Sequence, residues 1–193
     1  MPEKEKIAKA VRIISVPPVM ITVLIGILVR FRPQFFHNAA EIVMLILMLG
    51  ILPVLAYPLQ KILPAYREKG REGQRNLAFV LNMAGYSAAF IWAVVTKASD
   101  QVMMICATYF FSVLLLIICN KLIHFRASGH ASSFTGPLIF MVCFMGLKTL
   151  LPCIIFAALI LWSSLTLKRH TRKELMGGMA VCVFSAVLAF WII

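Results

Sequence analysis

The sequence predicts an all-α, polytopic integral membrane protein: a helical bundle with six to seven transmembrane helices. Of its 193 residues, 62% are hydrophobic, and the mean hydropathy is +0.94. A water-soluble domain of this length would have to expose much of that apolar surface. The apolar residues also fall into uncharged runs of 17 to 21 residues. Each run is close to the roughly 20 residues that cross a hydrocarbon core of ~30 Å.

Seven such runs follow one another along the chain: 13–29, 42–60, 76–96, 101–120, 131–147, 149–167 and 175–193. Pro17 and Pro18 fall early in the first run, where neighbouring helices can satisfy the lost hydrogen bonds. Pro53 and Pro58 are expected to kink the second. The residues KASD at 97–100 leave room only for a tight antiparallel turn between the third and fourth runs. The second and fifth runs are the shortest or least certain spans, so the predicted number of transmembrane helices is six to seven.

The chain 1–193 is predicted to be a single membrane domain, because its longest charged connection is only 61–75. No small-residue cleavage site follows the first run, so we expect it to be a retained helix and not a signal peptide. The five cysteines lie in apolar runs without paired metal-ligand spacing, and few carboxylates are present. The sequence therefore predicts no metal and no other cofactor.

The net charge of +12 favours a membrane surface over nucleic acid as the partner, because the basic residues flank the spans. On the N-terminal side, outside the candidate site, nine Lys and Arg lie in 4–12 and 61–75; the opposite side has four, Arg30, Arg32, Lys97 and Lys148. The positive-inside rule then places the N-terminus in the cytoplasm. The small size favours a microbial cytoplasmic (inner) membrane, and seven spans would put 120–131 and 168–174 on the cytoplasmic side together.

Two polar stretches at that side form the candidate site, ASGHASSFTG (127–136) and SSLTLKRHTRKELMGG (163–178). With the residues just before them they gather histidines, hydroxyls and cations suited to a phosphate. His170 and Glu174 are four residues apart, so on a helix they share a face. The carboxylate can accept the Nδ1 proton of His170 and leave Nε2 as a nucleophile, with His130 as proton donor to the leaving oxygen.

The pattern resembles the type 2 phosphatidic acid phosphatase superfamily, whose motifs are KxxxxxxRP, PSGH and SRxxxxxHxxxD. ASGH at 127–130 is similar to the second motif, with Ala127 for Pro. The run from Ser163 to Glu174 matches the third in spacing, with Ser164 for Arg and Glu174 for Asp. The first motif has only Lys121 and Arg126 as candidates, and they stand directly before the second. The resemblance covers about 101–193, the phosphatase-like core.

The resemblance implies roles for individual residues. His170 would attack phosphorus and form a phosphohistidine, Glu174 would orient it, and His130 would protonate the leaving group. The residues expected to hold phosphate oxygens are Lys121, Arg126, Ser128, Gly129 and Ser163, while Arg169 (or Lys168 or Arg172) replaces the arginine missing at 164. His37 is expected to be an ordinary interfacial residue, and the role of His124 stays open.

The predicted substrate is a phosphorylated lipid, and no catalytic metal is needed. Undecaprenyl diphosphate or a related polyprenyl phosphate is the first choice, followed by phosphatidic acid or phosphatidylglycerol phosphate. Two alternatives stay open, a non-catalytic lipid-phosphate binder or transporter and a lipid phosphotransferase. The sequence says nothing about the oligomeric state.

Overall fold

The computed structural model describes residues 3–193, and within them the chain forms helices and connecting loops without a strand. The helices are α1 (Glu3–Ile14), α2 (Pro17–Phe31), η1 (Pro33–Phe35), α3 (Ala39–Leu45), η2 (Ile46–Ile51), α4 (Leu52–Val54), α5 (Ala56–Ile62), α6 (Pro64–Arg67), α7 (Gly70–Val95), α8 (Asp100–Ile117), η3 (Ile118–Leu122), α9 (Gly129–Met145), η4 (Leu147–Thr149), α10 (Leu150–Thr166) and α11 (Arg172–Ile192). The predicted all-α bundle is confirmed.

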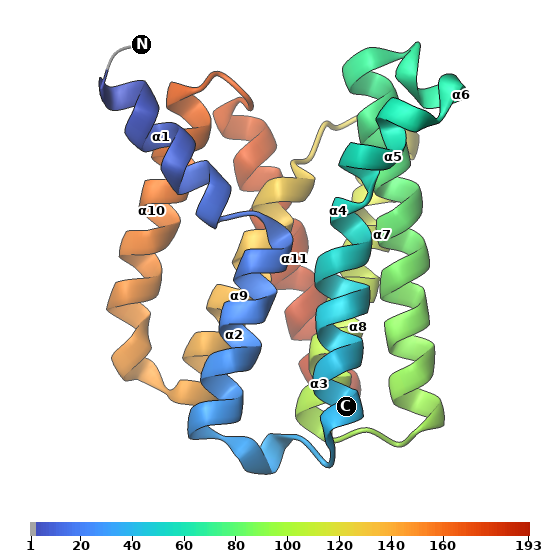
Figure 1. The fold of residues 1–193 in the computed structure, drawn as a ribbon. Helices are drawn as coiled ribbons and strands as arrows, with labels where there is room; N and C mark the ends of the chain where they lie inside the picture. The colour runs from blue at the N-terminus through green and yellow to red at the C-terminus, as the bar shows by residue number, and fades with distance from the viewer. Residues whose placement is uncertain (1–2) are drawn as a thin grey trace.

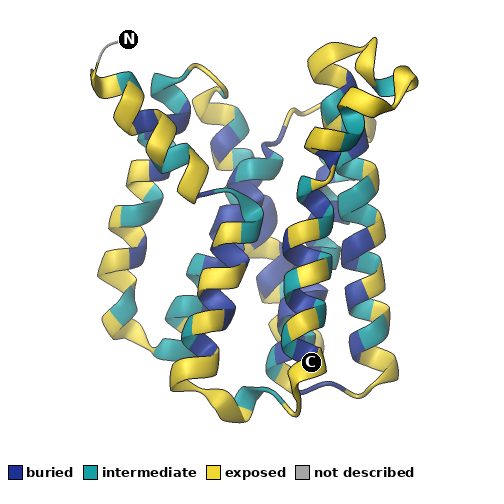
Figure 2. Cartoon of the chain, viewed as in Figure 1, coloured by how far each residue is buried: buried dark blue, intermediate teal, exposed yellow. Residues whose placement is uncertain are grey.

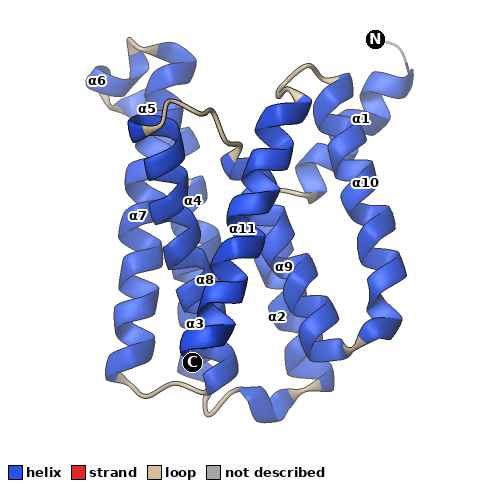
Figure 3. Cartoon of the chain, turned by 180° about the vertical axis from the view of Figure 1, so that it is seen from behind, coloured by secondary structure: helices blue, strands red, loops and turns tan. Residues whose placement is uncertain are grey.

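The chain runs back and forth between two ends of the bundle (Figure 1). We call the end that carries α1, α5 and α6 the N-terminal end. The loop between η3 and α9 and the loop between α10 and α11 return to this same end, as Figure 3 shows from behind. The opposite, far end carries η1, the α7–α8 turn and the α9–α10 turn. The two polar stretches singled out in the sequence therefore share one end.

Within residues 3–193, four helices are long and apolar enough to cross a membrane: α7, the 100–122 helix, the 147–166 helix and α11. The number rises to six if each of two bent helix pairs counts as one span. α9, which corresponds to the predicted run 131–147, has only 17 residues and falls among the shorter apolar helices. Large apolar side chains face outward along the outer helices, among them Leu151, Phe184 and Trp191. In water such exposure would be costly, whereas lipid tails accept it.

Both bends lie toward the N-terminal end. α1 and α2 meet at 59°, at a break after Ile14, and Pro17 begins α2, where its missing N–H costs nothing. The first predicted span therefore starts as a separate helix. The second run is helical from 39 to 62 but bends by 41° at Leu55, between the two prolines predicted to kink it. η2, a π-helical turn, lies just before this bend.

The buried residues lie mainly on the sides of the helices that face the interior of the bundle (Figure 2), and most of them are apolar. The largest cluster joins α2, η2, α7 and α8 and includes Leu24, Leu49 and Ile105. A second cluster joins α2, α9, α10 and α11 through residues such as Phe134, Ile160 and Leu175. α8, α9 and α11 pack closely on one another. This packed core supports the loops at the N-terminal end.

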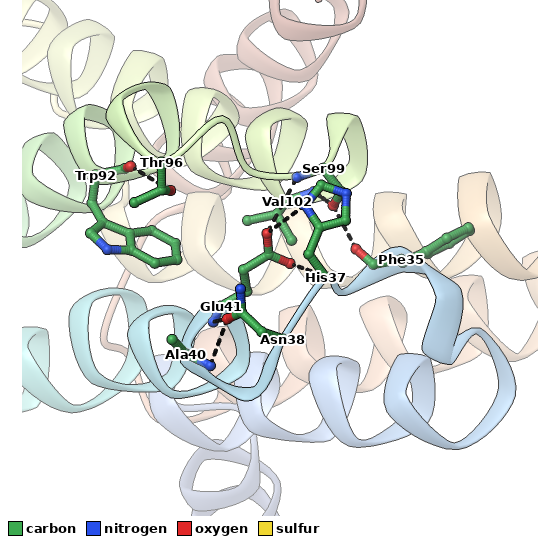
Figure 4. Close-up of polar contacts among 9 residues, drawn as sticks. All are labelled: Phe35, His37, Asn38, Ala40, Glu41, Trp92, Thr96, Ser99 and Val102. Carbon is green, nitrogen blue, oxygen red and sulfur yellow. Dashed lines mark hydrogen bonds and ion pairs between the residues drawn. The ribbon is translucent and has the colours of Figure 1, made fainter.

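The far end is held together by the carboxylate of Glu41, which is buried (Figure 4). It accepts hydrogen bonds from the backbone N–H groups of His37 at 2.8 Å and Ser99 at 3.4 Å, and it lies 3.3 Å from Nδ1 of His37. The Ser99 hydroxyl donates to the carbonyl of Phe35. Glu41 thus ties η1 and the start of α3 to the start of α8.

Candidate functional site

The first part of the candidate site is the segment that leads into α9. Ser128 is the N-cap of this helix, and its Oγ accepts a hydrogen bond from the N–H of Ala131 at 3.2 Å. Gly129 and His130 are the first two helical residues. The cap therefore fixes the position of His130 relative to the helix axis.

The second part is the start of α11. Thr171 is the N-cap and accepts a hydrogen bond from the N–H of Glu174, while the Glu174 carboxylate accepts from the N–H of Thr171. This reciprocal capping box holds the carboxylate beside the residue that precedes the cap, which is His170. Nδ1 of His170 lies 3.0 Å from Oε2 of Glu174. The i, i+4 contact predicted from the sequence is therefore present.

A direct link joins the two parts. The N–H of Ser128 donates a hydrogen bond to the carbonyl oxygen of Glu174 at 2.9 Å. The side chain of Arg126 adds an ion pair, with Nε 3.3 Å from Oε1 of Glu174. Gly178 permits this approach, because a Cβ there would collide with the carbonyl oxygen of Ser128. Two segments more than forty positions apart in the sequence are thus fixed to each other.

The environment of His170 favours a neutral imidazole. Burial lowers the pKa of His170 below its ordinary value, and the positive charges of Arg12 and Arg126 act in the same direction. The hydrogen bond and the charge of Glu174 oppose this change without cancelling it. Because Glu174 accepts the Nδ1 proton, the lone pair of a neutral His170 is on Nε2, the nitrogen that can attack phosphorus.

His130 is held from two sides. Its ring packs edge-to-face on Phe134, with the centroids 5.9 Å apart. Its Nε2 lies 3.4 Å from the hydroxyl of Ser15, which comes from the segment between α1 and α2. Burial lowers the pKa of His130 to about 3, and nearby positive charge, chiefly that of Arg12, acts in the same direction, so without a bound anion the ring is neutral.

A cavity of about 940 Å³ contains the site. This volume is near the upper limit of ordinary ligand pockets, about 300–1,000 Å³. The predicted site residues that line it are Lys121, Arg126, Ser128, Gly129, His130, Arg169, His170 and Glu174. Pro17 and Pro53, next to the two helix bends, also line it, so the bends open the N-terminal end around the cavity.

Ser163 is the predicted site residue that lies elsewhere. It is fully buried, and its hydroxyl donates a hydrogen bond to the carbonyl of Ala8 at 2.6 Å. α1 covers this end of α10, a packing that the sequence did not indicate. Ser163 therefore joins two helices and does not face the cavity. Its neighbour Ser164 is also fully buried, and its Oγ has no hydrogen-bond partner within residues 3–193.

The N-terminal half contributes cations that the sequence analysis missed. Arg12, Arg71 and Arg75 all line the cavity. They had been counted only as topology signals, because nothing in their spacing separates a charge that faces a cavity from one that faces head groups. The closest indication in the sequence was the number of basic residues in 61–75, which is larger than is needed to set the orientation of a membrane protein. The cavity thus has cations from both halves of the chain.

The remaining histidines differ in position. His124 lines the cavity, with Nδ1 3.1 Å from the carbonyl of Leu122 and a positive φ of 58°. His37 lies at the far end beside Glu41. Within residues 3–193, the His, Cys, Asp and Glu side chains form no group of three that could hold a metal ion.

Comparisons of the chain with protein-family models, curated proteins and solved structures found no match.

Proposed function

We propose that this protein is an integral membrane lipid phosphatase that works through a phosphohistidine on His170. The observation that carries the proposal is the shared cavity: His130, His170 and the Glu174 carboxylate behind His170 all line it. The resemblance of ASGH and of the Ser163–Glu174 spacing to the type 2 phosphatidic acid phosphatase motifs supports the same reading.

In the first step, Nε2 of neutral His170 attacks the phosphorus of the lipid phosphate. A P–N bond forms, and the P–O bond to the lipid alcohol or to the second phosphate breaks. Burial keeps His130 neutral until an anion binds; the negative charge of the bound phosphate then favours the imidazolium, which forms with a proton that the phosphate monoanion brings. The imidazolium gives this proton to the leaving oxygen and becomes neutral. Glu174 stabilises the positive charge that develops on His170, through the hydrogen bond at Nδ1.

In the second step, neutral His130 takes a proton from a water molecule whose oxygen attacks the phosphohistidine. The P–N bond breaks, inorganic phosphate leaves, and His170 returns to its neutral form. In this proposal Lys121, Arg126, Arg169 and the backbone amides of Gly129 and His130 hold phosphate oxygens, which is supported by the position of these residues in the lining of the cavity. Guanidinium groups and free amides stabilise the charge that builds up on those oxygens.

The substrate that fits best is an amphiphile with its phosphate at head-group level. The cavity lies at the end of the bundle, where its cations meet a polar region, while apolar helices continue below. A polyprenyl diphosphate remains our first choice, followed by phosphatidic acid or phosphatidylglycerol phosphate. From the Lys and Arg count, we infer that this end faces the cytoplasm of a microbial inner membrane.

The test is release of inorganic phosphate from polyprenyl diphosphate and phosphatidic acid by purified protein in the presence of a chelator. We expect turnover by the wild type and none by His170→Ala. Wild-type protein that binds these lipids without releasing phosphate at any pH would refute the proposal. Labelling of a cysteine placed in 122–128 with an impermeant reagent tests the sidedness separately, because fast labelling in intact cells would place the site outside.

The burial of Ser164 favours the non-catalytic lipid-phosphate binder as the second candidate. The third motif of the resembling family has arginine there, and Ser164 cannot replace a guanidinium. The phosphate assay separates this candidate from the enzyme. A phosphotransferase, the third candidate, would form a new phosphoester when an acceptor alcohol is added.

A further inference from the structure

α1 lies outside the part of the chain that resembles a phosphatase, yet it packs on the end of α10 that carries Ser163 and Ser164. The hydrogen bond from Ser163 to Ala8 fixes the register between the two helices. Ser164 is fully buried and is not among the residues that line the cavity. The position where the family motif has arginine therefore supplies no group to the cavity.

Arg12 follows Ala8 by four residues, one helical turn toward the cavity. It lines the cavity, and its charge acts on both His130 and His170. Nη1 of Arg12 is buried and has no hydrogen-bond partner among the described residues 3–193. Arg71 and Arg169 are close enough to repel its charge. A buried guanidinium nitrogen beside like charges is costly until an anion neutralises it.

Ser15 is three residues after Arg12 and is fully buried. Its hydroxyl proton goes to the carbonyl oxygen of Arg12, at 3.1 Å. Only a lone pair of Ser15 is then left for Nε2 of His130 at 3.4 Å, so Nε2 has to carry the hydrogen. Ser15 thus accepts a hydrogen bond from one ring nitrogen of His130, as Glu174 does from one ring nitrogen of His170. In each pair one ring nitrogen is engaged and the other is left for the substrate.

We propose that α1 completes the site: Arg12 binds a phosphoryl oxygen in place of the guanidinium absent at 164, and Ser15 is a positioning residue that leaves Nδ1 of His130 to exchange the proton. This inference rests on the proposed phosphatase function. When imidazolium His130 protonates the leaving oxygen, the proton comes from Nδ1, and the Nε2 hydrogen stays toward Ser15. The reverse transfer from water returns a proton to Nδ1.

The test of Arg12 compares Arg12→Ala and Arg12→Lys with Lys6→Ala, a matched loss of one charge on an exposed position of the same helix. We expect Arg12→Ala to lower kcat/KM by about 10²–10³-fold, as loss of a transition-state donor does. Arg12→Lys should recover part of that loss, and guanidinium ion below unfolding concentrations should partly rescue Arg12→Ala. Lys6→Ala should match the wild type.

Equal activity of Arg12→Ala and Lys6→Ala would overturn the role of Arg12. So would a loss in Arg12→Ala with neither guanidinium rescue nor recovery by lysine, because that pattern means packing alone. If the wild type has no turnover, the proposed function fails, and binding of inorganic phosphate measured by calorimetry then decides on Arg12. Weaker binding by Arg12→Ala than by Lys6→Ala supports the role, and equal binding overturns it.

The test of Ser15 uses two leaving groups. Ser15→Ala should lower kcat/KM for a lipid monophosphate, whose alcohol needs a proton, by about 10-fold or more, since general acid catalysis contributes about 10²–10⁴-fold. It should leave kcat/KM for p-nitrophenyl phosphate nearly unchanged, because kcat/KM reports formation of the phosphohistidine and nitrophenolate leaves in that step without a proton. Equal losses for both substrates would overturn the positioning role, as would no loss for either. Thermal unfolding of each variant checks that the fold is retained.

Discussion

The two ends of the bundle carry the same local arrangement of histidine and glutamate. In His37–Glu41 and in His170–Glu174 the histidine directly precedes a helix N-cap, and the glutamate is the third helical residue. The Nδ1 to carboxylate distances are similar, 3.3 and 3.0 Å. At the far end Glu41 is buried and bonded to backbone amides, while the His37 side chain is 59% exposed. There the pair holds loops together.

At the N-terminal end the exposure differs. The His170 side chain is only 22% exposed, and it borders a cavity with a second histidine and several arginines. The comparison shows that the local motif fixes the contact between a histidine and a carboxylate, whereas the tertiary surroundings decide whether that histidine borders a cavity.

The largest effect on turnover is expected from the loss of His170, the proposed nucleophile. His170→Ala should reduce phosphate release by about 10⁴-fold or more, since without it no covalent step is available. His37→Ala should keep turnover within about 2-fold, because surface changes away from a site have small effects. Steady-state assays on both variants measure the contrast. Equal losses would mean that the two pairs serve the same structural purpose.

The second contrast concerns the carboxylates. Glu174→Gln should lower kcat by about 10²–10³-fold, because the charge that stabilises the His170 imidazolium is removed. Glu41→Gln should instead lower the free energy of unfolding by about 1–3 kcal/mol, since buried backbone amides lose a charged acceptor. Turnover per folded molecule and thermal unfolding separate the two outcomes. A catalytic defect in Glu41→Gln with unchanged stability would contradict this division.

A third contrast uses two glycines at helix contacts. Gly178→Ala should push α11 away from Ser128 and lower kcat/KM by about 10²-fold, because displacements near 1 Å already disturb catalytic geometry to that extent. Gly85→Ala, whose Cβ would lie 2.6 Å from the carbonyl oxygen of Met48, should destabilise the bundle without this catalytic loss. Activity of Gly178→Ala equal to that of Gly85→Ala would show that the Ser128–Glu174 link does not position the site.

The sequence predicted those features of this molecule that depend on local pattern. Apolar runs marked the membrane helices, because the hydrophobic requirement of a span is local. The spacing of His170 and Glu174 predicted their contact on one helix face; the contact is present, but His170 precedes the N-cap Thr171, and the capping box, not the helix face, holds the carboxylate beside it. That the loops carrying His130 and His170 share one end followed from the alternation of helices between the two ends, and both histidines line the same cavity.

Contacts made by α1 could not be predicted, since they depend on a 59° bend and on how α1 lies over α10. The same contact explains why Ser163, expected at the phosphate, is bonded to Ala8. Arg12 and Arg71 looked like topology charges, because a basic residue at a membrane end has the same sequence pattern whether it faces lipid or a cavity. Their inward position became visible only in the folded bundle.

The smallest expected effect is a shift in pH dependence at constant fold. In the proposed mechanism neutral His170 is the nucleophile, so kcat/KM should fall as the pH drops through the pKa of His170, which burial holds below its ordinary value. Arg126→Gln removes a charge that lowers this pKa, and the acid limb should therefore move to higher pH. Arg30→Gln, at the far end, should leave the limb in place; a limb that moved equally in both variants would exclude His170 as its origin.

His170 should also affect the stability of the protein. Its pKa is lower in the folded protein than in the unfolded chain. At a pH between these two values, the unfolded chain therefore binds more protons than the folded protein. The free energy of unfolding then decreases as the pH falls through this range. In His170→Ala this slope should be weaker than in the wild type, while in His37→Ala it should persist, as pH-dependent thermal unfolding can measure. A slope that is unchanged in His170→Ala would mean that His170 is as easily protonated as a solvent-exposed histidine, and the neutral nucleophile would lose its physical basis.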